Sequence, residues 1–205
     1  MRPPEGTRIR VAPGASARLA VVVWLSSPEV LGAVLLAALC HELGHYAALR
    51  RRGGWVRAVR IAALGAEMQG AGRMGYGGEL LAAAAGPAVN LLLAAALGLL
   101  GRWWEPLYLL AGAQAVLGCF NLLPILPLDG GRMLWLALCW GTDPFLADRV
   151  AQAVSLAAAG LLTVAGAALA RRSPFLLWTA AALLVCAAAP CIKRRRSVYA
   201  SPKGR

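Results

Sequence analysis

The chain has 205 residues, of which 60% are hydrophobic and only 15% are charged, and its formal net charge is +12. This composition is too apolar for a soluble domain of this length and indicates a polytopic membrane protein. The basic residues stand at the ends of apolar runs, and no DNA- or RNA-binding motif accompanies them. We therefore expect a lipid bilayer around the chain and no nucleic-acid partner.

Six apolar segments indicate membrane spans, of which several are near the ~20 residues that a membrane-spanning helix needs, while the first and last are short. The first has no A-x-A cleavage pattern after it, so we expect an uncleaved span rather than a signal peptide. The stretch from Pro124 to Trp140 is interrupted by prolines and glycines, and it predicts an irregular, re-entrant type of segment followed by a short helix. The six expected spans are residues 17–27, 30–49, 80–100, 106–123, 147–170 and 174–190.

The distribution of basic residues predicts how these spans are oriented. With six spans, one side receives both termini and the loops after the second and fourth spans. All Lys and Arg residues lie on that side except Arg102, Arg171 and Arg172. Because Lys and Arg are enriched in cytoplasmic loops, we expect a multi-pass protein of the cell membrane with both termini in the cytoplasm.

Residues 53–78 are rich in glycine and do not read as a span. Trp55–Ile61 alternates loosely between apolar and polar residues, and Gly65 could turn a hairpin. A flexible loop is an equally admissible interpretation. The expected fold is thus an all-α polytopic membrane protein of about six transmembrane helices, with a small β-hairpin on the cytoplasmic side.

The only two histidines of the chain stand in the second expected span, within His41-Glu42-Leu43-Gly44-His45. Histidines four residues apart share one face of a helix and can bind the same metal ion. Glu42 is close enough to take a proton from a water that zinc activates. A charged residue at membrane depth costs about 2.5–3.5 kcal/mol and usually marks a functional site. The alternative is a pair of histidines with structural hydrogen bonds.

A third metal ligand would have to be a carboxylate, because no histidine remains. Asp129 is the one further acidic residue inside an apolar stretch; the rest lie near the termini, in loops, beside the expected hairpin or in a polar turn. Asp129 could equally serve as the N-cap of a helix, since Gly-Gly and an apolar run follow it. The residues alone leave both roles open.

These motifs together resemble a known family. His41-Glu-Leu-Gly-His45 joined to Asn121-Leu-Leu-Pro-Ile-Leu-Pro-Leu-Asp129-Gly-Gly-Arg132 is similar to the site-2 protease family of intramembrane zinc metalloproteases. The second motif is most similar to the bacterial branch that includes stage IV sporulation protein FB. Gly86-Pro87-Ala-Val-Asn90 resembles a further motif of the family, and the three motifs stand in the family's order.

The resemblance implies one zinc ion per chain, bound by His41, His45 and Asp129 with water as the fourth ligand. It implies that Glu42 acts first as the general base and then as the general acid. The five cysteines form no CxxC pair and read as small buried hydrophobes rather than ligands.

The resemblance also implies that Asn121 and Pro127 help to shape the substrate site. Asn121 could donate a hydrogen bond to the oxyanion or to a substrate carbonyl, or it could make an interhelical hydrogen bond instead. Asn90 would be structural and pack near the catalytic helix. Trp55–Ile61 would offer the edge to which an unwound substrate adds as a strand.

The implied function is an intramembrane zinc metalloendopeptidase that cleaves membrane-associated proteins near the cytoplasmic face. A sporulation sigma-factor precursor is one candidate substrate, and general membrane proteostasis is the alternative. We expect one membrane-embedded domain over residues 1–205, with a catalytic core at about 28–140, regulatory membrane partners, and no PDZ or cystathionine-β-synthase-type domain. A metal-ion transporter is an alternative of another class, which the lack of a second histidine motif disfavours.

Overall fold

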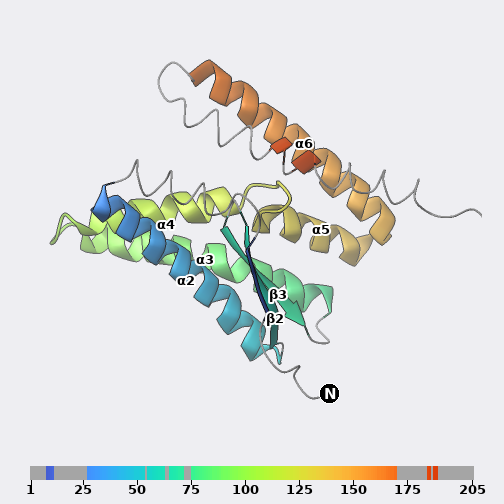
Figure 1. Ribbon diagram of the computed structural model, residues 1–205, viewed down its shortest axis with the longest axis horizontal. Helices are drawn as coiled ribbons and strands as arrows, with labels where there is room; N and C mark the ends of the chain where they lie inside the picture. Colours follow the sequence, from blue (N-terminus) through green and yellow to red (C-terminus); the bar gives the residue numbers. More distant parts are fainter. Residues whose placement is uncertain are drawn as a thin grey trace, which may run out of the picture. The chain divides into compact units, whose positions relative to one another are not determined.

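The computed structural model divides the chain into two compact units, residues 1–122 and 123–205. The first unit holds a three-stranded sheet and helices α2, α3 and α4, and the second holds α5 and α6 (Figure 1). For the three strands the structure describes the backbone only. The structure describes residues 8–11, 27–53, 55–62, 65–71, 75–169, 184–185 and 187–188.

Helix α2 spans Pro28–Arg51 and carries the histidine motif. Its start is specified locally, because the Ser27 hydroxyl accepts a hydrogen bond from the Val30 amide at 3.4 Å and a proline opens the first turn. The chain leaves the helix at Gly53, whose φ of 72° favours glycine. These signals at both ends place a 24-residue helix where the second span is expected.

Helices α3 (Tyr76–Leu100) and α4 (Leu107–Asn121) pack against α2 and against each other (Figure 1). Their buried faces carry several small residues, which let helix backbones approach closely. Asn90 of α3 is fully buried, and its Nδ2 donates to the Ala37 carbonyl of α2 at 3.5 Å. This bond reaches α2 one turn before His41, so the structural role expected for Asn90 beside the helix of the histidine motif is confirmed.

The sheet has the order β1-β2-β3, in which β1 (Arg8–Val11) runs parallel to β2 (Trp55–Ala62) and β3 (Gly65–Ala71) runs antiparallel to it. Both β2 and β3 pack against α2. Because β2 is the central strand, the prediction that it offers a free edge to a substrate is wrong; the outer strands are β1 and β3. Residues 63–64, the turn of the expected hairpin, lie outside the described residues.

The second unit pairs α5 (Asp129–Gly141) with α6 (Pro144–Leu169). The Trp135 indole N–H on α5 donates to the Asp148 carboxylate on α6 at 2.6 Å, which joins the two helices. An irregular segment precedes α5, and its Leu126–Pro127 peptide bond is cis. The expectation of an irregular stretch followed by a short helix is confirmed.

Within the described part of the chain, three helices, α2, α3 and α6, are long and apolar enough to cross a membrane, and they coincide with the second, third and fifth expected spans. Helix α4 lies where the fourth span is expected, but its 15 residues fall short of the usual ~20. The first and sixth expected spans lie almost entirely outside the described residues. The count of six therefore stays a prediction.

Gly131 in the first turn of α5 lies against the backbone of the preceding segment. A Cβ at this position would meet the Ile125 carbonyl carbon and the Leu126 nitrogen at 2.5 Å, and neither can yield without moving the chain. We expect Gly131→Ala to lower the free energy of unfolding by about 1–3 kcal/mol, the usual cost of overpacking. Differential scanning fluorimetry in detergent measures this as a lower melting temperature.

The matched control is Gly141→Ala at the end of the same helix, where a Cβ would meet nothing within 4 Å. We expect this variant to melt at the wild-type temperature or slightly above it, since alanine favours helix. Equal melting temperatures for the two variants would contradict the close approach at Gly131.

Candidate metal centre

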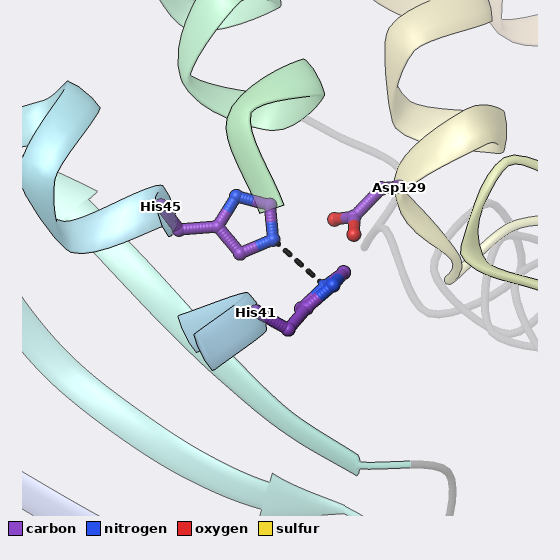
Figure 2. Close-up of side chains that lie close together, drawn as sticks. All are labelled: His41, His45 and Asp129. Carbon is purple, nitrogen blue, oxygen red and sulfur yellow. Dashed lines mark hydrogen bonds between the residues drawn. The ribbon is translucent and has the colours of Figure 1, made fainter. Parts of the chain in front are cut away.

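His41 and His45 lie one turn apart on α2, and a ring nitrogen of each points toward the other (Figure 2). Their Nε2 atoms are 3.0 Å apart, and the ring centroids are 4.6 Å apart in an edge-to-face arrangement. Two nitrogens bound to one tetrahedral zinc ion at 2.0–2.1 Å are themselves about 3.3 Å apart. The pair therefore already has nearly the spacing that a shared zinc ion requires.

The contact of His45 with α3 fixes which ring nitrogen can bind a metal. Its Nδ1 lies 2.8 Å from the Ala82 carbonyl oxygen. A carbonyl only accepts hydrogen bonds, so Nδ1 must carry the proton and the lone pair must lie on Nε2. A backbone partner of this kind orients metal-binding histidines and sets their tautomer. In this tautomer the His41 Nε2–H donates to the His45 Nε2, and a metal bound at the His41 Nε2 would require that proton to move to Nδ1 of the same ring.

Gly86 of α3 provides the space for the His45 ring. A Cβ on this residue would lie 2.6 Å from the His45 Cε1 and closer still to Nε2, so any larger residue would displace the imidazole. Pro87 follows directly and cannot donate to the carbonyl of Ala83, four residues earlier. The Gly86–Asn90 motif thus lines the histidine site: glycine leaves room for the ring, and Asn90 holds α2 by its backbone.

Glu42 is half-buried and lies one residue after His41 and three before His45. On a helix this places its carboxylate beside the face that the two histidines share. A carboxylate there can accept a proton from a water molecule held near the histidines. This position suits the predicted general base.

Asp129 is the first residue of α5, and Leu128 occupies the N-cap position without a side-chain capping bond. The alternative that Asp129 caps the helix is therefore wrong. Among the described residues, the group of His, Cys, Asp or Glu that could hold a metal ion consists of His41, His45 and Asp129 (Figure 2). These three residues are a candidate zinc site, as the sequence motifs predict.

The sequence matches known metalloproteases over part of its length. Residues 99–165 match the profile of peptidase family M50. Rip3 of Mycobacterium tuberculosis, named provisionally as a zinc metalloprotease, is 37% identical over 139 aligned residues, covering 56% of this chain and 32% of Rip3. Zinc metalloprotease MJ0392 of Methanocaldococcus jannaschii is 28% identical over 130 residues, covering 57% of this chain and 38% of the relative. The match thus spans about a third of each relative's length.

The structure matches a site-2 protease from Methanocaldococcus jannaschii with a TM-score of 0.70, covering 91% of this chain and 92% of that one at 21% sequence identity. The chain has the site-2 protease fold. In fold and in part of its sequence the chain is similar to the site-2 proteases of peptidase family M50, and it is a multi-pass membrane protein. The names of these relatives make no reference to sporulation, so the resemblance to the sporulation branch stays a prediction.

Within this site-2 protease fold, Asn121 and Pro127 lie at either end of the connection between α4 and α5. Asn121 is the last residue of α4, and its Nδ2 donates to the Leu117 carbonyl of the same helix at 3.0 Å. The alternative of an interhelical hydrogen bond is therefore wrong. The predicted contacts of both residues with a substrate stay predictions.

Two parts of the histidine site were absent from the sequence prediction. The Ala82 carbonyl is a backbone atom, and no residue type signals which carbonyl a distant histidine will reach. In the sequence, Gly86 was identified only as one residue of a family motif, and the space that it leaves for the ring was not predicted. A glycine just before a proline inside an apolar helix is the available signal, because it suggests close approach of another group.

Proposed function

We propose that this chain is an intramembrane zinc metalloendopeptidase of the site-2 protease type. The observation that carries the proposal is the His41–His45 pair, whose Nε2 atoms meet at 3.0 Å within an apolar helix long enough to span a bilayer. Polar groups at such a depth are expensive and mark functional sites. The relatives named as zinc metalloproteases support the same activity.

The mechanism assigns a role to each residue of the site. His41, His45 and Asp129 would hold the zinc ion, which when bound activates water and polarises a peptide carbonyl. Glu42 takes the proton of the attacking water and delivers it to the leaving amine. Asn121 would donate its amide N–H to the developing oxyanion after giving up its bond to Leu117.

The substrates of this activity would be membrane proteins or membrane-associated proteins. A peptide bond inside a helix is shielded by the helix's own hydrogen bonds, so the segment must unwind before attack. The unwound segment would pair with an outer strand of the sheet, β1 or β3, because β2 is central. The positive charge around the termini supports cytoplasmic termini and cleavage near the cytoplasmic face.

The direct test is cleavage by purified protein reconstituted in lipid vesicles with a single-span substrate protein that carries a helix-breaking Gly-Pro near its cytoplasmic end. We expect one cut within the span. The cut should stop when 1,10-phenanthroline removes the metal and resume when zinc is added back. Zinc flux across the vesicles without any cleavage would overturn the proposal and favour the transporter alternative.

The same preparation tests the third ligand. We expect Asp129→Ala to lose most of its bound zinc and its cleavage activity, because two neutral imidazoles alone bind zinc weakly. Glu105→Ala, which removes an exposed carboxylate from the loop before α4, should keep both. Atomic absorption of the purified variants measures zinc per chain, and full zinc content in Asp129→Ala would remove this residue from the ligand set.

A further inference from the structure

One buried hydroxyl holds the segment that leads to Asp129. Ser155 of α6 has no exposed surface, and its Oγ accepts a hydrogen bond from the Leu126 amide at 3.0 Å. The hydroxyl carries a single hydrogen, which it donates to the Ala151 carbonyl at 2.7 Å. The Pro124 carbonyl, at 3.4 Å, is the alternative acceptor for that hydrogen.

The segment needs such a partner because it is neither helix nor sheet. Pro124 and Pro127 have no amide N–H, and they interrupt any regular pattern of backbone hydrogen bonds. The amides between them must therefore find other acceptors. Ile125 is fully buried and Leu128 is 4% exposed, whereas Pro127 between them is exposed, so the segment is partly buried. An amide N–H that is shielded from water and has no acceptor is destabilising, and Ser155 supplies the acceptor for the part-buried amide of Leu126.

The position of Leu126 is passed on to Asp129 through tight contacts. The Leu128 amide donates to the Ile125 carbonyl at 2.7 Å and closes a turn around Leu126. On the far side of Asp129, a Cβ on Gly131 would meet the Leu126 nitrogen at 2.5 Å, so the first turn of α5 rests directly on this turn. A shift of Leu126 would therefore move the start of α5, where Asp129 stands.

We infer that Ser155 is a positioning residue for the Asp129 zinc ligand, acting through the amide of Leu126. The inference rests on the proposed function in one respect, which is that Asp129 binds zinc. Ser155 itself touches neither metal nor substrate in this scheme. Its contribution is to the affinity for zinc, which depends on where the carboxylate is held before the metal arrives.

The test compares three substitutions of Ser155 in the full-length protein. Ser155→Ala removes the hydroxyl, Ser155→Cys keeps a similar size but is a poor acceptor, and Ser155→Thr restores the hydroxyl. Thr142→Ala is the matched control, because the Thr142 hydroxyl also donates to a carbonyl four residues earlier, at 2.7 Å, but on the exposed end of α5. Hydrogen–deuterium exchange of the zinc-free protein and zinc titration against a fluorescent chelator are measured for all variants.

We expect the Leu126 amide to exchange faster in Ser155→Ala and Ser155→Cys, and zinc affinity to fall by about tenfold, the lower end of the range for groups that orient metal ligands. Ser155→Thr and the control should behave like the wild type. A general loss of stability would speed exchange throughout α5 and α6, whereas this effect is confined to the segment at 124–128.

Two results would overturn the inference while leaving the proposed function intact. Unchanged exchange at Leu126 in Ser155→Ala would show that the hydroxyl does not hold the amide. Faster exchange with unchanged zinc affinity would show that the segment does not position the ligand. A wild-type protein that binds no zinc would instead end the proposed function and the ligand role together, and the wild-type titration identifies that case.

Discussion

A Glu42→Gln variant will keep its zinc and will cleave substrate about 10²–10⁴-fold more slowly than the wild type, the range that a lost general base accounts for. Glutamine has nearly the same size and can still hydrogen-bond, but it cannot accept the proton of the attacking water. Glu42 is not part of the candidate ligand set, so the metal should stay bound. The measurement is the cleavage rate in vesicles together with zinc per chain.

The chain offers a matched control on the same helix. Glu29 lies in the first turn of α2, exposed and three turns before the histidines. Glu29→Gln removes the same charge from the same element and should cleave at the wild-type rate. A wild-type rate for Glu42→Gln would rule out Glu42 as the base, even with zinc bound.

A Gly86→Ala variant will fold and will lose most of its affinity for zinc. The added methyl group would occupy the space of the His45 ring, which must rotate away from His41 and from the Ala82 carbonyl. Loss of an orienting partner alone typically costs 10–100-fold in metal affinity, and here the ligand itself is displaced, so we expect a loss of at least about 100-fold. A zinc titration against a chelator measures it.

Gly98→Ala is the control for this variant, because it lies in the same helix and a Cβ there would meet nothing within 4 Å. Both substitutions should favour the helix by up to about 1 kcal/mol, since alanine is a better helix former than glycine. Loss of zinc in Gly86→Ala without a lower melting temperature would therefore be a local effect at His45. Normal zinc affinity would contradict the packing of the ring against Gly86.

The helix of the histidine motif was predictable because its determinants are local. A serine cap, a proline in the first turn and a long apolar run define α2, and the spacing of His41 and His45 follows from helix geometry. Asp129 was harder, since a carboxylate followed by Gly-Gly and an apolar run suits both a zinc ligand and a helix cap. In the structure Leu128, and not Asp129, has the N-cap position, which decides between the two roles. The residue types alone do not determine the backbone conformation at this position.

The sheet was less predictable because its first pairing is not local. Four residues, Arg8–Val11, pair in parallel with Ala58–Ile61, about fifty positions later. Four residues are too few to show the alternation of apolar and polar side chains that indicates a strand. Parallel strands are also not joined by a hairpin turn, so no turn residues predict the pairing. Without β1, the strand Trp55–Ala62 reads as an edge, and with β1 it becomes the centre of the sheet. The error in the expected substrate edge follows from this single missed strand.

The start of α5 at Asp129 has an electrostatic consequence for this side chain. The first backbone amides of a helix point outward with a partial positive charge, which favours a nearby anion by about 0.3–1 kcal/mol at exposed sites and more where water is scarce. The backbone of α5 thus offsets part of the desolvation penalty of the half-buried, anionic Asp129 side chain. A neutral isostere at position 129 would forgo both the metal bond and this attraction to the helix terminus.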